Sequence, residues 1–162
     1  MTPGAQLTIG DGTSIFSECY VNLAEPVTIG SRSALSSRVT ILTHGCWQPV
    51  LDGYPSAFAP VDLGDDVVVY YGSTILPGCR VGDGTLVAAS TVVTTSLPAH
   101  CLAAGAPARV VRQPYPEPLS DSQRRERLDA ILAMYAQTLE YKGFTDVRDS
   151  LSSSGELHCR FD

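Results

Sequence analysis

The aliphatic positions of this chain recur every six residues. One unbroken series contains Leu63, Val69, Ile75, Val81, Val87 and Val93, and a second contains Ile9, Ile15, Val21, Ile29, Leu35 and Ile41. A period of six fits neither an α-helix nor an alternating strand, but it is typical of a parallel β-helix in which three short faces make one coil of about eighteen residues. The pattern predicts an all-β prism of about four coils with its aliphatic side chains stacked inside.

Two interruptions show where this prism is irregular. An aliphatic residue followed by Gly and then Asp or Ser occurs at residues 9–11, 29–31, 63–65 and 81–83. These intervals of 20, 34 and 18 residues exceed one coil by two, by sixteen and by none. We therefore predict a two-residue bulge near residues 24–26 and a loop insertion over residues 45–60. Both interruptions fall at the same corner of adjacent coils.

The C-terminal part of the chain has a different character. Residues 114–118 read Pro-Tyr-Pro-Glu-Pro, a stiff extended linker. Ser120 and Gln123 have the spacing of a capping box, and Gly143 is a natural helix stop. We expect a β-helical domain over residues 1–112, followed over residues 113–162 by the linker, a helix at 120–142 and a tail.

Composition narrows the possible partners. The formal net charge of −6 and the pI near 4.9 argue against nucleic acid as the main partner. No stretch is apolar enough to span a membrane, and the N-terminus has no signal pattern. Five cysteines, without CxxC spacing, favour a reducing compartment over a disulfide framework. These features predict a cytoplasmic protein.

Several segments resemble the hexapeptide-repeat acyltransferases, in particular the sugar and glycan O-acetyltransferases. They are Leu-Gly-Asp-Asp-Val at 63–67, Ile-Leu-Pro-Gly at 75–78 and Gly-Ala-Pro-Ala-Arg-Val-Val-Arg at 105–112. The resemblance covers about residues 7–112. It implies a left-handed parallel β-helix, a homotrimer, acetyl-CoA bound as co-substrate in a groove between subunits, and a histidine there that acts as general base.

His44 is the candidate for that base, because it ends the second coil and directly precedes the loop. Transfer of an acyl group from a thioester to a hydroxyl needs a base that works near neutral pH. A solvated corner histidine is the alternative interpretation, and a nucleophile at Cys46 is a less favoured one. Glu25, in the bulge below His44, is the candidate orienting carboxylate, and a solvent-exposed bulge residue is the equal alternative. Asn22 is a candidate contact of the acceptor substrate.

The predicted loop carries aromatic side chains that suit a carbohydrate. Trp47 and Tyr54 are candidate substrate-binding residues, because aromatic rings stack on sugar rings. The same side chains would equally anchor the loop by burial. The sequence leaves open the acceptor, whether transfer is to oxygen or nitrogen, and whether the acyl group is acetyl or longer.

For coenzyme A, the family's contacts carry over to Tyr71, Ala89, Thr94, Thr95, Arg109 and Arg112. The arginines suit the phosphates of coenzyme A, and a solvated pair beside the linker is the alternative interpretation. Tyr70 and Tyr71, however, stand where the family has small residues. This departure supports a second hypothesis, a non-catalytic binding or assembly module with a decayed groove.

A metal-dependent activity on the same scaffold, as in the γ-class carbonic anhydrases, needs three convergent imidazoles. The chain has three histidines, His44, His100 and His158, at unsuitable spacing. The resemblance thus implies an acetyl-CoA-dependent O-acyltransferase of a small-molecule or glycan hydroxyl, and the histidine spacing gives no indication of a metal site.

Overall fold

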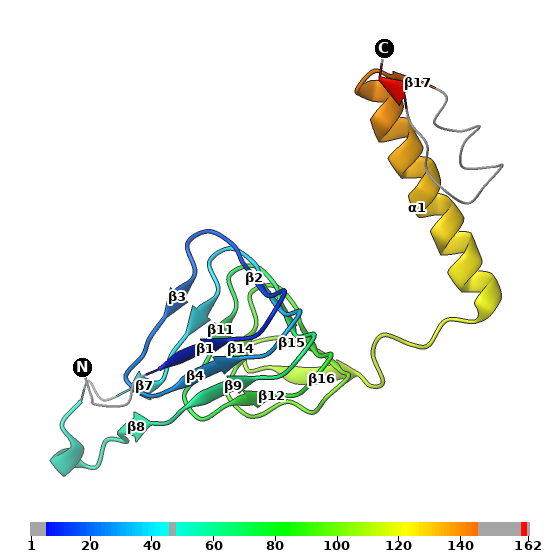
Figure 1. The fold of residues 1–162 in the computed structure, drawn as a ribbon. Coiled ribbons are helices and arrows are strands. Elements are labelled where there is room, and N and C mark those ends of the chain that lie inside the picture. The colour runs from blue at the N-terminus through cyan, green and yellow to red at the C-terminus, as the bar shows by residue number, and fades with distance from the viewer. Residues whose placement is uncertain (1–5, 46–47, 146–159, 162) are drawn as a thin grey trace. The chain divides into compact units, whose positions relative to one another are not determined.

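Three parallel β-sheets enclose one core in the first part of the molecule (Figure 1). The computed structural model describes residues 6–45, 48–145 and 160–161, and the chain divides into two compact units, residues 1–117 and 118–162. Sheet A contains β1 (Leu7–Ile9), β4 (Val27–Ile29), β9 (Val61–Leu63) and β12 (Arg80–Val81). Sheet B contains β2 (Ser14–Ile15), β5 (Ala34–Leu35), β10 (Val68–Val69), β13 (Leu86–Val87), β15 (Leu102–Ala104) and the antiparallel β16 (Arg109–Arg112). Sheet C contains β3 (Tyr20–Val21), β6 (Thr40–Ile41), β11 (Thr74–Ile75) and β14 (Val92–Val93).

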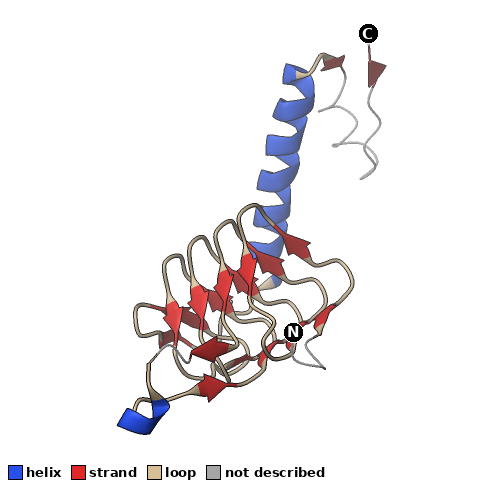
Figure 2. Cartoon of the chain, turned by 90° about the vertical axis from the view of Figure 1, so that its left-hand side faces the viewer, coloured by secondary structure: helices blue, strands red, loops and turns tan. Residues whose placement is uncertain are grey.

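The chain visits sheets A, B and C in turn, so that each strand pairs with the strand one circuit later. Val21 lies opposite Ile41, Ile41 opposite Ile75, and Ile75 opposite Val93. The intervals are therefore 20, 34 and 18 residues, and the extra residues of the first two circuits all fall between sheet C and the next strand of sheet A. We call the turns between the sheets the A–B, B–C and C–A corners. Figure 2 shows the resulting rows of short parallel strands.

The six-residue series forms the core of the prism. Ile29, Leu35 and Ile41 are fully buried, as are their counterparts in the next circuits. In the first circuit, Ile9 and Ile15 are 45% and 41% exposed, because no described strand pairs with the outer edge of β1 or β2. Burial therefore depends on a neighbour on each side of a circuit, as stacked repeats require.

Left-handed backbone conformations build the corners. Glu18, Arg38, Gly72 and Ser90 have φ between 56° and 67° at successive levels of the B–C corner. Only glycine adopts this region without steric cost, so the other three are held there by the ladders on either side. Their side chains lie on the surface, where they can contact each other or a ligand.

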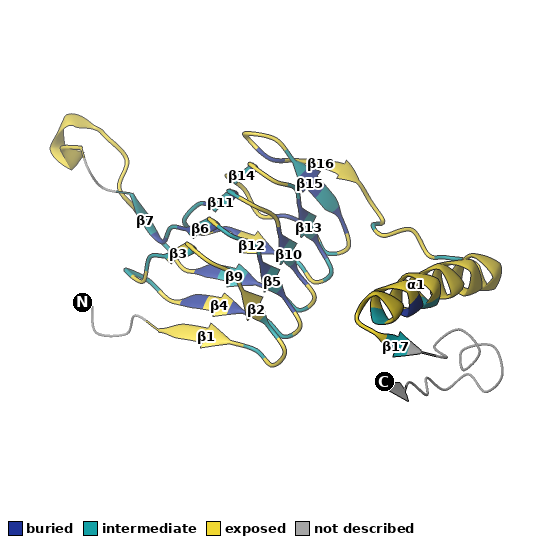
Figure 3. Ribbon diagram, turned by 90° about the horizontal axis from the view of Figure 1, so that it is seen from above, coloured by how far each residue is buried: buried dark blue, intermediate teal, exposed yellow. Residues whose placement is uncertain are grey.

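The insertion at the C–A corner is not a plain loop. Its two ends form an antiparallel pair, β7 (His44–Gly45) with β8 (Ala57–Phe58), and a short 3₁₀ helix, η1 (Val50–Asp52), lies between them. Figure 3 shows this excursion projecting from the prism. Its side chains are exposed at Val50, Leu51, Tyr54 and Phe58.

The longest element described in the second unit is helix α1 (Asp121–Tyr141), whose N-cap Ser120 forms a reciprocal capping box with Gln123. Strands β17 (Phe144–Thr145) and β18 (Arg160–Phe161) form a short antiparallel pair beside it. Most of the fold class is thus confirmed: the molecule is mostly β, with parallel sheets and one C-terminal helix.

Candidate functional site

His44 lies at the C–A corner, directly above the bulge of the preceding circuit. Its Nδ1 is 2.7 Å from Asn22 Oδ1. The contact joins residues 22 positions apart, and it follows from the register, because Val21 pairs with Ile41 and brings Asn22 beside the Leu42–His44 segment. The insertion at 24–26 and the excursion at 45–60 therefore meet at one place on the surface.

The orientation of the Asn22 amide determines which nitrogen of His44 carries the proton. Asn22 Oδ1 accepts a hydrogen bond from the backbone N–H of Ala24 at 3.2 Å, so the oxygen, and not the NH₂ group, occupies this position. An oxygen acceptor at 2.7 Å requires that Nδ1 of His44 donates. In the neutral imidazole the lone pair then lies on Nε2, which is the arrangement of a general base.

Thr43 ties this arrangement to the backbone. Its side chain is fully buried, and its Oγ1 lies 2.7 Å from Asn22 Oδ1 and 3.1 Å from the Asn22 carbonyl, to which it can donate. The same hydroxyl accepts the N–H of Glu25 at 3.1 Å. A buried hydroxyl with partners on both sides resists rearrangement.

The structure places Asn22 Oδ1 against Nδ1 of His44, whereas the sequence predicts that Glu25 is the orienting residue. Glu25 enters the network through its backbone N–H. The physical reason is the tight Asx-type turn that Asn22 makes with Ala24, which directs the amide oxygen toward the histidine. Asn22, predicted as a contact of the acceptor substrate, is therefore already engaged with His44.

Phe58 covers one face of the histidine, a contact that sequence reasoning missed. The two rings stack with centroids 5.6 Å apart and an interplanar angle of 23°. The pairing of β7 with β8 sets Phe58 opposite His44. Of the other predicted substrate contacts in this excursion, Tyr54 follows η1 in the chain and is half exposed, and Trp47 lies outside the described residues.

The predicted coenzyme A contacts fall into three places. Thr94 and Thr95 are exposed at the C–A corner, two circuits above the level of His44. Tyr71 and Ala89 occupy successive levels of the B–C corner, linked by the hydrogen bond from Ser90 N–H to the Tyr71 carbonyl (2.9 Å). Sheet C separates these two groups, so one chain presents two parallel edges and not a single groove.

The two arginines lie at opposite ends of β16. Arg109 pairs with Ala104 and donates from Nη1 to the Ala108 carbonyl at 2.9 Å, near the B–C corner. Arg112 pairs with Leu102 and forms an exposed ion pair with Glu117, with 3.6 Å between Nη1 and Oε1. The structure therefore places Arg109 near Ala89, and Arg112 away from it.

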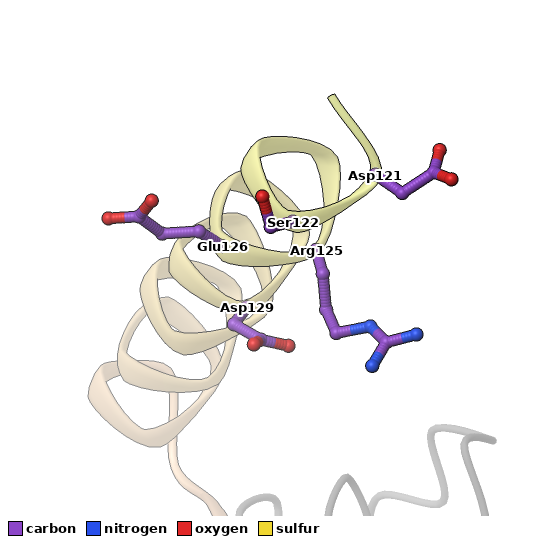
Figure 4. Close-up of a pocket in the computed structure, with 5 residues that line it drawn as sticks. All are labelled: Asp121, Ser122, Arg125, Glu126 and Asp129. Carbon is purple, nitrogen blue, oxygen red and sulfur yellow. The ribbon is translucent and has the colours of Figure 1, made fainter. Parts of the chain in front are cut away.

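Each of the two compact units carries a surface hollow. One runs along sheet A beside Asp62 and Arg80, which form an ion pair at 3.2 Å. The other lies on the first turns of α1, where Figure 4 shows its lining side chains, including Arg125 and Glu126. The described residues contain no cluster of three or more His, Cys, Asp or Glu side chains suited to a metal ion. Within the same residues, no helix combines the length and apolar character needed to cross a bilayer.

Solved structures of known proteins share this architecture. A hexapeptide-repeat acetyltransferase from Vibrio cholerae superposes with a TM-score of 0.62 at 26% identity, over 67% of this chain and 62% of that one. The structure of the same acetyltransferase in complex with acetyl-CoA superposes with a TM-score of 0.60 at 28% identity, over 65% of this chain and 59% of that one. A maltose O-acetyltransferase from Clostridium difficile gives 0.59 at 28% identity, over 65% and 58%.

Sequence comparison agrees with the structural one. A stretch of 59 residues, 36% of this chain, is 44% identical to 2,3,4,5-tetrahydropyridine-2,6-dicarboxylate N-acetyltransferase from Staphylococcus aureus. The chain spans 25% of the length of that relative. No family model matches the chain. The fold is that of the hexapeptide-repeat acetyltransferases, and the resemblance found in the sequence is confirmed.

Proposed function

We propose that this protein is an acetyl-CoA-dependent O-acyltransferase that acts on a carbohydrate or similar hydroxyl, with His44 as general base. The observation that carries the proposal is the chain of contacts from Ala24 N–H through Asn22 Oδ1 to His44 Nδ1. Because Nδ1 donates, Nε2 is the basic nitrogen of the neutral ring, and Phe58 of the excursion stacks against that ring. The acetyltransferases with the same fold, one of them solved with acetyl-CoA, support the reaction class.

Transfer proceeds directly, without an acyl-enzyme. Nε2 of His44 accepts the proton of the acceptor hydroxyl as its oxygen bonds to the thioester carbonyl carbon. The tetrahedral intermediate collapses with cleavage of the C–S bond, and the imidazolium returns its proton to the departing thiolate. The products are the acetyl ester and free coenzyme A, and the histidine ends in its starting tautomer. Glu25 contributes to this site through its backbone N–H, which donates to the Thr43 hydroxyl and helps to fix it.

Coenzyme A has contacts available on both edges of sheet C. We propose a left-handed coil and a homotrimer, in which the C–A edge of one subunit, with His44, Thr94 and Thr95, faces the B–C edge of a second. In that arrangement Tyr71, Ala89 and Arg109 complete the groove, and Arg112 exchanges Glu117 for a phosphate. Tyr54 and Trp47, on the excursion, contact the acceptor.

The proposal is tested by titrating the whole protein with coenzyme A and acetyl-CoA in a calorimeter, and by following coenzyme A release with maltose, galactosides and amino-group acceptors. We expect micromolar-range binding and release that depends on a sugar hydroxyl. Release that depends only on an amine would overturn O-transfer. Absence of binding at millimolar ligand would favour the non-catalytic module, which the half-exposed Tyr70 and Tyr71 in the cofactor groove would then explain.

A further inference from the structure

Arg38 bridges two neighbouring circuits at the B–C corner. Its Nε donates to Glu18 Oε2 at 2.7 Å, and its Nη1 donates to the Tyr71 hydroxyl at 2.8 Å. The guanidinium carbon also lies 5.7 Å from the centroid of the Tyr71 ring, within the range of a cation–π contact. We call these three residues the corner ladder.

The backbone makes the corner ladder possible. Arg38 N–H donates to the Ser17 carbonyl and Gly72 N–H to the Ser37 carbonyl, so the three levels are directly stacked. Glu18 and Arg38 both adopt a left-handed φ, of 61° and 62°. Equivalent conformations at successive levels send the two side chains out of the corner in the same direction, and the charges therefore meet.

The corner ladder restrains the Tyr71 side chain although that side chain is exposed. The Tyr71 side chain is 46% exposed, and a phenol ring at such a site would ordinarily sample several rotamers. Arg38 engages both its hydroxyl and its ring. The next residue along this edge is the small, exposed Ala89, one circuit away. A fixed ring beside a small residue forms a step against which a narrow uncharged chain can pack.

We propose that Arg38 is a positioning residue for the acyl-CoA substrate, acting by holding Tyr71 as a rigid wall for the pantetheine arm. This inference rests on the proposed function above. It also explains how Tyr71 can stand where the family has a small residue. A ring that is held in one position still leaves a groove of defined shape, although the shape differs. Preorganisation of this kind raises affinity by lowering the ordering cost on binding.

The charge of Arg38 favours this role over direct phosphate binding. Like any arginine side chain it is cationic at neutral pH, and its hydrogen bond to Glu18 and the neighbouring Tyr71 hydroxyl raise the pKa of the guanidinium above its ordinary value. Glu18 already balances that charge at 2.7 Å. A phosphate would have to displace a carboxylate, whereas a neutral pantetheine arm leaves the ion pair intact.

The test compares Arg38→Gln, Tyr71→Ala and the double variant in calorimetric titrations with coenzyme A. Arg32→Gln is the matched control, because Arg32 is an equally exposed arginine with left-handed φ and a carboxylate partner, at the A–B corner of the same circuit. Thermal melting of each variant checks that it is folded. For an accepted sugar, KM for acetyl-CoA and kcat are measured alongside.

We expect Arg38→Gln to raise the Kd of coenzyme A and the KM of acetyl-CoA roughly three- to tenfold, as loss of one ordering contact predicts, with kcat nearly unchanged. Arg32→Gln should bind like the wild type. In the Tyr71→Ala background, Arg38→Gln should have no further effect, because its action passes through Tyr71.

Three results would overturn the inference: a wild-type Kd in Arg38→Gln, equal losses in Arg38→Gln and Arg32→Gln, or an undiminished Arg38→Gln effect in the Tyr71→Ala background. The last would mean that Arg38 contacts the ligand directly. These outcomes require that the wild type binds coenzyme A. A wild type that does not bind would instead overturn the proposed function and, with it, this assignment.

Discussion

Asn22 and His44, 22 residues apart in the chain, are joined by a hydrogen bond of 2.7 Å between Oδ1 and Nδ1. The bond connects the two places where the repeat is interrupted. Ala24, within the first interruption, orients the amide, and His44 begins the second. The irregular parts of the prism thus build the candidate site, while the regular parts support it.

Two replacements of Asn22 should separate its effect on the orientation of the His44 ring from the effect of a charge beside that ring. Asn22→Leu removes the acceptor at Nδ1, and we expect kcat to fall by about tenfold to a hundredfold through loss of the productive tautomer. Asn22→Asp keeps the acceptor and adds a negative charge that stabilises the imidazolium. The acid limb of its pH–rate profile should therefore move to higher pH. Equal losses in both variants, with no change in the profile, would show that Asn22 serves the acceptor substrate instead.

Thr43 should matter for stability more than its size suggests. Thr43→Val keeps the shape of a fully buried side chain but leaves Glu25 N–H without its hydroxyl partner. We expect the free energy of unfolding to fall by about 1–3 kcal/mol. Thr43→Ser, which keeps the hydroxyl, should lose less. Urea denaturation of both variants measures the difference, and the opposite order would contradict the hydrogen-bonded role.

The burial gradient along the prism gives a matched pair of core mutations. Ile75→Ala removes a fully buried side chain and should cost about 2–5 kcal/mol of unfolding free energy. Ile15 occupies the same type of position in the first circuit but is 41% exposed. Ile15→Ala should cost markedly less. An equal cost for both would show that the first circuit is covered in solution.

Acid stability should depend on the Arg32–Asp66 pair. The hydrogen bond from Arg32, whose Nη2 lies 2.7 Å from Asp66 Oδ2, lowers the pKa of the Asp66 carboxyl below its ordinary value. The pair therefore stabilises the fold above the unfolded pKa of the carboxyl and ceases to do so as pH falls through the lower folded pKa. The melting-temperature advantage of the wild type over Arg32→Gln should be present at neutral pH and vanish in strong acid. An advantage that persists there would contradict this assignment.

The sequence predicts the prism well because each aliphatic residue of the six-residue series packs on its own counterparts in adjacent circuits. Counting intervals was enough to set Val21 opposite Ile41 and to place both interruptions at one corner. The same count brings Asn22 beside the segment ending in His44. This signal could have identified the orienting residue, but the negative charge of Glu25 made it the preferred partner.

Contacts that depend on the geometry of local turns could not be predicted from the sequence. Phe58 reaches His44 only because the excursion closes as a β7–β8 pair, which no periodicity indicates. Arg38 meets Tyr71 across 33 residues because corner residues share a left-handed conformation. The repeat predicts levels and corners, whereas side-chain direction at a corner depends on backbone angles that the hydrophobic pattern does not encode.

The central claim is that His44 removes the proton of the acceptor hydroxyl, and the most direct test measures kcat for sugar-dependent coenzyme A release in His44→Asn. His100→Asn is the control, because His100 is an exposed corner histidine whose left-handed φ of 52° asparagine tolerates. We predict that His44→Asn lowers kcat by about a hundredfold or more while the Kd of coenzyme A stays at the wild-type value, and that His100→Asn retains full activity. A His44→Asn variant that turns over like the wild type would contradict the account.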